Sequence, residues 1–271
     1  MILKVAELSY NHHGDDEILK TLIGKASEAG ATHIKFEKRA KESYTEFKSN
    51  KQLFELSDEQ IDLLIEICKK FGLGWFCSVR DISSANAIAK FKPKKVKIAS
   101  REAHSLDFIA SVIKIFEDQV EYVISTGGLT LEQIQLIHDL MDENQISSKL
   151  TLVHCVSKYP HSNDESNINR IKYLKQTYAC KVGYSGHESG IEPSIFAAIL
   201  GVSYIERHLA LDQTDVVKSN VNYTDEKCTL TPTEFQQMCK SIDSFVRLKT
   251  LPLRDIPLDD ELNRLRLQNI R

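Results

Sequence analysis

The feature that most constrains this chain is a short apolar run that returns eight times, each time followed by an amphipathic helical pattern. The runs occupy residues 2–8, 32–36, 73–77, 95–99, 121–125, 149–155, 181–185 and 202–206. Between them, apolar residues recur at three- and four-residue spacing. Strands that alternate with helices form a parallel sheet. Eight such units within about 250 residues are typical of a closed barrel, so we predict an α/β fold, the (β/α)8 TIM barrel.

An open, doubly wound sheet is the alternative architecture, and roughly five to seven strands suffice for it. The residues after the first run, AELSYNHHG, lack the GxGxxG fingerprint of dinucleotide-binding sheets, which counts against it. We expect the barrel to span residues 1–249, with a last helix over 231–249. Residues 250–271 contain two prolines and then spaced leucines, and we expect them to form a strap or linker on the outside of the barrel.

Composition narrows the class of partner. The chain has 35 Lys and Arg against 38 Asp and Glu, a formal net charge of −3, which excludes the basic bias of a dedicated nucleic-acid-binding protein. Its longest uncharged stretch, 193–205, is too short to span a bilayer. The six cysteines lack paired spacing. We expect a cytoplasmic protein with reduced thiols and with neither a nucleic-acid nor a membrane partner.

Two lysines lie in runs that a barrel would bury, Lys35 in HIKFE and Lys97 in VKIAS. A buried ammonium group must face an anion. In one interpretation, each lysine pairs with an internal carboxylate such as Glu7 or Glu37. Four serines are expected at the same end of the barrel: Ser78, Ser100, Ser125 and Ser185. Two cations among several short hydroxyl donors favour the other interpretation, an anionic ligand that carries phosphate and carboxylate groups.

Two histidines, His187 and His208, follow adjacent predicted strands, so their imidazoles can converge over the mouth of the barrel. Glu206 lies two residues before His208 and therefore points the same way. Two imidazoles with open positions and a nearby carboxylate suit a divalent transition metal. A single histidine is more often a hydrogen-bonded core residue, and the spacing alone leaves both interpretations open.

Seven motifs, in order, resemble those of the sialic acid synthase family. They are AELSYNHHGD, AGATHIKFEKR, KIASRE, YVISTGGLTLEQI, LVHCVSKYP, VGYSGHESGIE and YIERHLALD, and they extend over about residues 3–245. The resemblance implies a transferase that condenses phosphoenolpyruvate with an N-acylated amino-sugar aldehyde, such as N-acetylmannosamine. The products would be a nonulosonic (sialic-type) acid and phosphate. In related enzymes the vinyl carbon of phosphoenolpyruvate attacks the aldehyde, and phosphate leaves with C–O cleavage.

The same resemblance implies a role for particular residues. The phosphoenolpyruvate-binding group would comprise Lys35, Ser78, Lys97, Ser100, Ser125, Ser157 and Ser185. His187 and His208 would hold Mn²⁺ or Mg²⁺, which polarises the aldehyde as a Lewis acid. The catalytic group, which holds or protonates the sugar and the metal-bound water, would comprise Glu7, Tyr159, Glu206 and Asp225.

The chain departs from the family pattern at several places. Glu37 stands where glutamine is usual, and Arg101 where glycine is usual. Gly186 replaces a common aspartate, a change that we expect to weaken metal binding. The loop that contains Asp225 is longer than usual. The family normally continues into a small C-terminal domain that resembles type III antifreeze protein. We expect this chain to lack that cap, so its partner would be a second copy in a homodimer or a separate cap-domain chain.

The sequence leaves several alternatives open. The neuraminic, legionaminic and pseudaminic acid routes all use this scaffold. A related synthase acting on another aldose would need an acceptor-phosphate site, and the sequence shows no extra basic cluster for it. A non-catalytic or partner-dependent homologue would explain a lost cap, yet both lysines and both histidines are present. A glycosidase with Glu7 and Glu206 as its carboxylate pair leaves two buried lysines unexplained.

Overall fold

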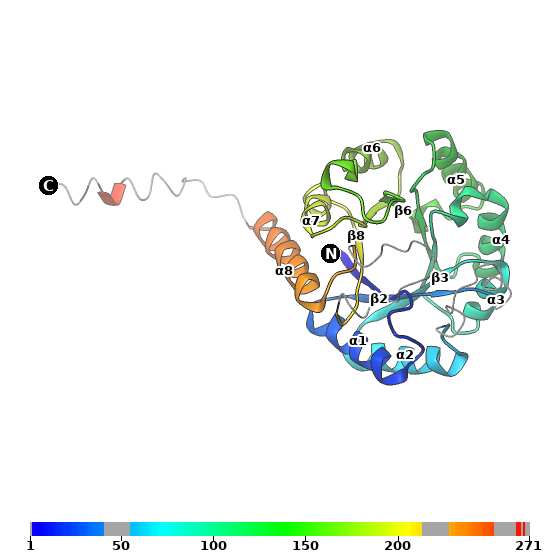
Figure 1. Cartoon of the computed structure of the whole chain (residues 1–271). Coiled ribbons are helices and arrows are strands. Elements are labelled where there is room, and N and C mark those ends of the chain that lie inside the picture. Colours follow the sequence, from blue (N-terminus) through cyan, green and yellow to red (C-terminus); the bar gives the residue numbers. More distant parts are fainter. Residues whose placement is uncertain (1, 41–54, 213–227, 252–263, 267, 269–271) are drawn as a thin grey trace.

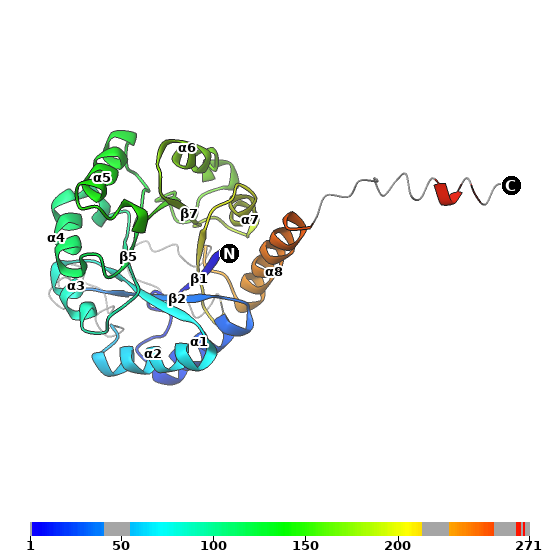
Figure 2. The same cartoon turned by 180° about the vertical axis from the view of Figure 1, so that it is seen from behind.

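The fold is a closed barrel of eight parallel strands. The computed structural model describes residues 2–40, 55–212, 228–251, 264–266 and 268. Within them, neighbouring strands pair in sequence order from β1 to β8, and β8 pairs with β1 to close the barrel. Helices surround the strands in both views (Figures 1 and 2). The predicted TIM barrel is confirmed, and the open sheet is excluded.

Strands and helices alternate along the chain. The strands are β1 Leu3–Glu7, β2 His33–Lys38, β3 Gly74–Val79, β4 Lys95–Ile98, β5 Glu121–Ser125, β6 Leu150–Cys155, β7 Lys181–Ser185 and β8 Tyr204–His208. The α-helices are α1 Asp16–Glu28, α2 Asp58–Phe71, α3 Ile82–Ala89, α4 Leu106–Phe116, α5 Leu131–Glu143, α6 Asn169–Thr177, α7 Glu192–Ile199 and α8 Pro232–Lys249. Short 3₁₀ helices span η3 Glu102–His104, η4 Ser147–Lys149 and η5 Asn163–Ser166.

Helix starts follow capping signals in the sequence. At α5, the Thr130 hydroxyl accepts from the backbone N–H of Gln133, and the Gln133 side chain accepts from the N–H of Thr130. Thr231 and Glu234 form the same reciprocal pair at α8. No helix in the described part of the chain is long and apolar enough to cross a membrane. Most of the predicted strap or linker, residues 250–271, lies outside the described residues.

Two strand boundaries differ from the sequence-based expectation in a way that moves site residues. β8 was expected over 202–206, but Gly201 turns the chain with a φ of 80°, and pairing with β1 begins only at Tyr204, opposite Leu3. His208 is therefore the last strand residue and does not lie in the following loop. Similarly, β3 continues to Val79, so Ser78 lies inside the strand.

Inside the barrel, an apolar layer supports a polar one. Five buried side chains, one from each of β1, β3, β5, β6 and β8, form an apolar cluster separate from the core beneath the helices. Because side chains alternate along a strand, the residue two positions later points to the same side. The resulting pairs are Val5 and Glu7, Phe76 and Ser78, Val123 and Ser125, Val153 and Cys155, and Tyr204 and Glu206. The apolar layer is thus the floor of a polar mouth.

Gly183 leaves space for the Tyr204 ring in that floor, since a Cβ at position 183 would lie 2.9 Å from the Cβ of Tyr204. We predict that Gly183→Ala lowers the free energy of unfolding by roughly 1–3 kcal/mol, because it overpacks a closed core. Gly24→Ala in α1 is the control: outside its own helix, the nearest described atom to its Cβ would belong to Phe71, at 3.8 Å, and alanine favours a helix interior. Denaturant unfolding compares the two, and equal stability would contradict the packing argument.

Candidate active site

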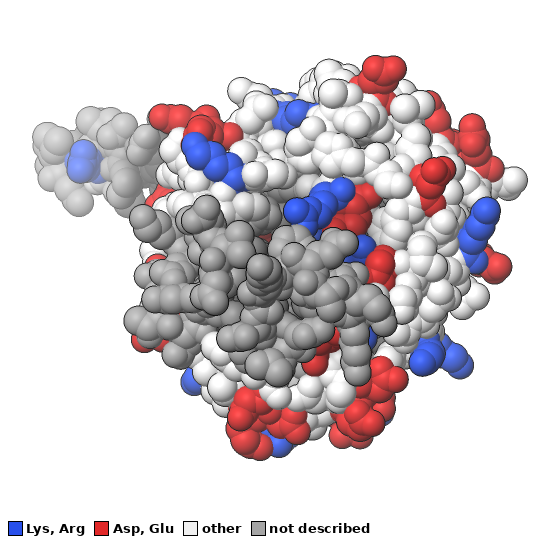
Figure 3. Space-filling view, turned by 45° about the vertical axis from the view of Figure 1, so that its right-hand side comes forward, with Lys and Arg blue, Asp and Glu red and all other residues white. Residues whose placement is uncertain are grey.

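The carboxyl ends of the strands bring most of the predicted site residues to one mouth of the barrel. Lys35, Lys97, Glu7 and Glu206 all lie there, each at most 3% exposed. These four side chains are buried, while other basic and acidic side chains lie next to one another at the surface on one face of the molecule (Figure 3). Charges of both signs therefore meet within a small space.

The four charged groups form one cluster. Lys35 Nζ contacts the carboxylate of Glu7 and lies 3.6 Å from Glu206 Oε1. Lys97 Nζ donates to the same Glu206 oxygen at 2.6 Å. The interpretation with internal carboxylates therefore describes the ligand-free chain, with Glu7 and Glu206 rather than Glu37 as the partners. Two cations face two carboxylates, so the cluster is balanced in charge.

Burial and the neighbouring charges together set the pKa values of Glu206 and Lys35. Burial alone would raise the pKa of Glu206, but Lys35 and Lys97 hold it well below its usual range. Burial lowers the pKa of Lys35 to about 8, although the charge of Glu206 favours the protonated form. Glu206 is therefore ionised at neutral pH, and Lys35 loses its charge in the mildly alkaline range.

Hydroxyl groups lie on either side of the charged cluster. Ser78 Oγ accepts from Lys35 at 2.8 Å, and Ser185 Oγ donates to Glu206 at 3.0 Å. Ser125, at the end of β5, is also buried. These three predicted residues thus belong to the polar layer itself.

The other two predicted serines, Ser100 and Ser157, lie around Gly127. A Cβ at Gly127 would lie 2.7 Å from Ser100 Oγ and closer still to Ser157 Oγ. The N–H of Gly127 donates to Ser100 Oγ at 3.2 Å, and Cys155 Sγ lies 3.1 Å from that oxygen. Gly127 was not predicted as a site residue. The run TGG directly after the fifth strand is the signal that could have found it.

The two histidines lie side by side, with 5.7 Å between their ring centroids. Burial, and then repulsion from His208, lowers the pKa of His187 to about 3. Burial, and then Lys35, lowers the pKa of His208 to about 4. Both rings are neutral at pH 7, the form that binds metal ions. His187 Nδ1 lies 2.9 Å from the carbonyl oxygen of Val156, so this nitrogen carries the proton and Nε2 carries the lone pair.

The donor set fits a divalent metal ion with two protein ligands. His208 Nδ1 is buried and has no hydrogen-bond partner among the described residues. No group of three or more His, Cys, Asp or Glu side chains within the described ranges could hold a metal. Two imidazoles thus leave several coordination positions for water or substrate oxygens. Asp225, the remaining predicted acidic residue, lies outside the described residues.

Tyr159 lies at the rim of this mouth. Its ring is tilted against His187 with 4.0 Å between the centroids, and it is 38% exposed. An aromatic face that is partly open to solvent can pack against a bound sugar. The position is compatible with the role that the resemblance implies.

Glu37 does not reach the lysines as a free carboxylate. Arg80 pairs with Glu37 and also donates to Glu102 at 2.7 Å. Burial would raise the pKa of Glu37, but Arg80 holds it at about 2. The extra carboxylate expected from the sequence is therefore present and neutralised. No local pattern in the sequence identifies Arg80 as its partner.

Gly186 provides the space for another carboxylate, that of Glu188. A Cβ at position 186 would lie 2.7 Å from Glu188 Oε1 and closer still to Oε2. Glu188 is completely buried and pairs with Arg207 at 2.9 Å. The carboxylate of Glu188 thus lies where a side chain at 186 would be, and the expected weakening of metal binding stays a prediction.

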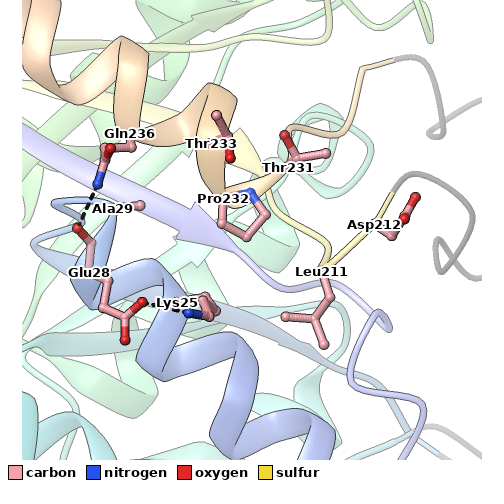
Figure 4. Close-up of a pocket in the computed structure, with 9 residues that line it drawn as sticks. All are labelled: Lys25, Glu28, Ala29, Leu211, Asp212, Thr231, Pro232, Thr233 and Gln236. Atoms are coloured by element: carbon pink, nitrogen blue, oxygen red, sulfur yellow. Dashed lines mark hydrogen bonds and ion pairs between the residues drawn. The ribbon is translucent and has the colours of Figure 1, made fainter.

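A second depression, of about 620 Å³, lies between α1 and α8 and carries none of the predicted site residues (Figure 4). Lys25 pairs with Glu28 at 2.7 Å, and Gln236 donates to the carbonyl oxygen of Glu28 at 3.3 Å. These polar groups already satisfy one another. The mouth of the barrel is therefore the better candidate site.

Glu206 is the shared partner of two buried lysines, and its removal should be costly. We predict that Glu206→Gln lowers the free energy of unfolding by about 3–5 kcal/mol, because it leaves buried charge uncompensated. The control is Glu121→Gln: Glu121 also pairs with two lysines, Lys95 and Lys181, but is 35% exposed. That change should cost less than about 1 kcal/mol. Equal losses in denaturant unfolding would refute the account of the cluster.

Known proteins resemble this chain over most of its length. An uncharacterized protein of Methanocaldococcus jannaschii is 31% identical over 242 residues, which cover 88% of this chain and 69% of that protein. The N,N'-diacetyllegionaminic acid synthase of Campylobacter jejuni is 29% identical over 259 residues, which cover 89% of this chain and 75% of the synthase.

The fold has a close structural counterpart. The N-acetylneuraminic acid synthetase of Leptospira borgpetersenii, crystallised with citrate, matches with a TM-score of 0.80 at 23% identity, over 99% of this chain and 91% of that one. The model of the NeuB family matches residues 22–250. Since that match covers nearly the whole barrel, this chain belongs to the NeuB family of sialic acid synthases.

Proposed function

We propose that this protein condenses phosphoenolpyruvate with an N-acylated amino-sugar aldehyde, such as N-acetylmannosamine, consumes one water molecule, and releases a nonulosonic acid and phosphate. It would thus be a C–C bond-forming transferase. The main support for this reaction is the polar mouth, where Lys35 and Lys97 lie among serine hydroxyls below two neutral imidazoles. Family membership supports the class of reaction. The sugar acceptor, a homodimer or separate cap chain, and the cytoplasmic location stay predictions.

Phosphoenolpyruvate would bind by exchanging partners with the internal carboxylates. Lys35 and Lys97 both lie near one oxygen of Glu206. Either lysine can therefore turn to a phosphate or carboxylate oxygen of the ligand while the other lysine stays paired with Glu206. Charge-assisted hydrogen bonds to an anion are stronger than neutral ones. Gly127 lets the hydroxyls of Ser100 and Ser157 approach its backbone, since a Cβ there would clash with both, and this pair of hydroxyls supports a site for phosphate oxygens.

The carboxylates would act as fixed negative charges. Lys35 and Lys97 hold the pKa of Glu206 too low for it to donate a proton at neutral pH. Its charge would instead stabilise the positive charge that develops on phosphoenolpyruvate after the vinyl carbon attacks the aldehyde. With its pKa lowered to about 8 by burial, Lys35 would be suited to give a proton to the aldehyde oxygen as that oxygen becomes a hydroxyl.

His187 and His208 would hold the Mn²⁺ or Mg²⁺ ion. When bound, this ion would supply Lewis-acid polarisation of the acceptor aldehyde. The chain's own contribution is orientation: the Val156 carbonyl fixes the His187 ring so that Nε2 is free to coordinate. Tyr159, against the same ring, would pack on the sugar.

The first test is phosphate release from phosphoenolpyruvate with Mn²⁺ and a panel of N-acylated amino sugars. We expect release with at least one sugar, and loss of release after chelation or in His208→Ala. The control is His138→Ala, since His138 lies on α5 and pairs with Asp142 at 3.2 Å. Chelator-resistant release would contradict the metal assignment. Silence with every sugar, together with no binding of phosphoenolpyruvate, would contradict the proposed function.

Affinity for phosphoenolpyruvate should depend on the charge of Lys35. Since burial lowers the pKa of Lys35 to about 8, the cation is present at pH 7 and mostly lost at pH 9. We predict that the Kd for phosphoenolpyruvate rises about tenfold between these pH values, because binding is linked to that proton. The phosphate group stays fully ionised over this range. Calorimetry measures the Kd. Lys35→Arg, which keeps its charge, should remove the pH dependence of the Kd. A wild-type Kd that stays constant between pH 7 and pH 9 would contradict the role of the Lys35 charge.

A further inference from the structure

Behind the two imidazoles lies a buried ion pair, Glu188 and Arg207. Arg207 Nη1 donates to Glu188 Oε1 at 2.9 Å, and neither side chain is exposed. Arg207 also donates to three backbone carbonyl oxygens: those of Glu188 at 2.8 Å, Gly190 at 2.7 Å and Cys228 at 3.1 Å. One guanidinium thus joins β8 to the loop after β7 and to the residues that precede α8.

The Glu188 carboxylate is held by further groups on neighbouring elements. Its Oε2 accepts from the hydroxyl of Tyr184 in β7 at 2.9 Å, and its Oε1 accepts from the hydroxyl of Ser194 in α7 at 2.8 Å. His161 Nε2 lies 3.7 Å from Oε2. The backbone N–H of His161 donates to the carbonyl oxygen of His187 at 3.2 Å. These contacts tie the carboxylate to the segment that carries His187.

The pair is adjacent in sequence to both imidazoles. Glu188 directly follows His187, and Arg207 directly precedes His208. Side chains alternate along β8, so Arg207 points away from the barrel interior while His208 points into the mouth. The ion pair therefore links the two backbone segments that carry His187 and His208. It does so on the outer side of the barrel, whereas the two imidazoles lie on the inner side.

Stability alone does not account for this arrangement. A buried ion pair gains little net free energy over an apolar pair of similar volume, because desolvation offsets the attraction. The contacts of Arg207 with three carbonyl oxygens on different segments favour a role in fixing their geometry. Gly186 fits the same interpretation: the carboxylate of Glu188 lies in the space that a side chain at 186 would occupy.

We propose that the Glu188–Arg207 pair is a positioning device that fixes the His187 and His208 imidazoles relative to one another, and that Gly186 is required to admit the carboxylate. Glu188 and Arg207 are positioning residues and touch no substrate. The use of the two rings as metal ligands rests on the proposed function, whereas their relative placement does not.

The test compares four variants with the wild type. Glu188→Gln keeps the volume and removes the charge, and Glu188→Ala removes the whole group. In Gly186→Asp/Glu188→Ala, the aspartate at position 186 places a carboxylate in the space that Glu188→Ala frees. Asp243→Asn is the control, because it breaks the Lys4–Asp243 pair of 2.6 Å between β1 and α8. Two readouts are used: Co²⁺ affinity by visible absorption, and the imidazole ¹⁵N signals of the metal-free protein.

For the metal, we expect Glu188→Gln to bind Co²⁺ roughly 10- to 100-fold more weakly, the usual effect of losing a group that orients a ligand. The double variant should bind more tightly than Glu188→Ala, and Asp243→Asn should match the wild type. For the metal-free protein, the wild type should show a single His187 tautomer with the proton on Nδ1, because the Val156 carbonyl accepts there. Glu188→Gln should show a mixture.

The outcomes separate this proposal from the proposed function. If the wild type binds no Co²⁺, the metal assignment fails, and the His187 signals alone decide the positioning claim. A folded Glu188→Gln with wild-type signals and wild-type Co²⁺ affinity overturns the proposal. If both single variants at 188 fail to fold, the double variant decides: restored His187 signals support the proposal, and signals unlike those of the wild type overturn it.

Discussion

The buried pairing of two lysines with two carboxylates is the constraint on which the rest of this site depends. Lys35 and Lys97 could not lie above an apolar floor without Glu7 and Glu206, since uncompensated buried charge is too costly. The same pairing keeps Glu206 ionised, whereas burial lowers the pKa of Lys35 to about 8 even though the charge of Glu206 opposes that shift. Because the ligand-free cluster is balanced in charge, an anion can bind only if a lysine leaves an internal carboxylate for the ligand. The same ion pairs therefore affect both the stability of the fold and the binding of the substrate.

Strand β8 shows how one alternating pattern serves two purposes. Glu206 and His208 point into the mouth, where one joins the lysines and the other lies beside His187. Arg207, between them, points outward and pairs with Glu188. A single strand thus carries a charge for the proposed reaction, an imidazole for the proposed metal ion and the guanidinium that fixes their surroundings. The inner and outer side chains of β8 thus make different contacts, but they share one backbone.

The sequence reveals the parts of this site that depend on local pattern. Lys35 and Lys97 stand out because each interrupts an apolar strand, and eight strand–helix units predict the barrel that brings them together. The boundary of β8 was misplaced because the apolar run starts earlier than the pairing, which is set by β1. Two features were beyond reach: the pairs Arg80–Glu37 and Glu188–Arg207 join different strands and loops, and no spacing along one chain identifies such partners.

We propose that the two lysines exchange their internal carboxylates for the anion of the substrate. A crystal structure of the chain with phosphoenolpyruvate tests it most directly. We predict phosphate or carboxylate oxygens of the ligand within hydrogen-bonding distance of the Nζ atoms of Lys35 and Lys97, with at least one lysine displaced from Glu206. Phosphoenolpyruvate bound elsewhere, with both lysines still on their carboxylates, would contradict the claim.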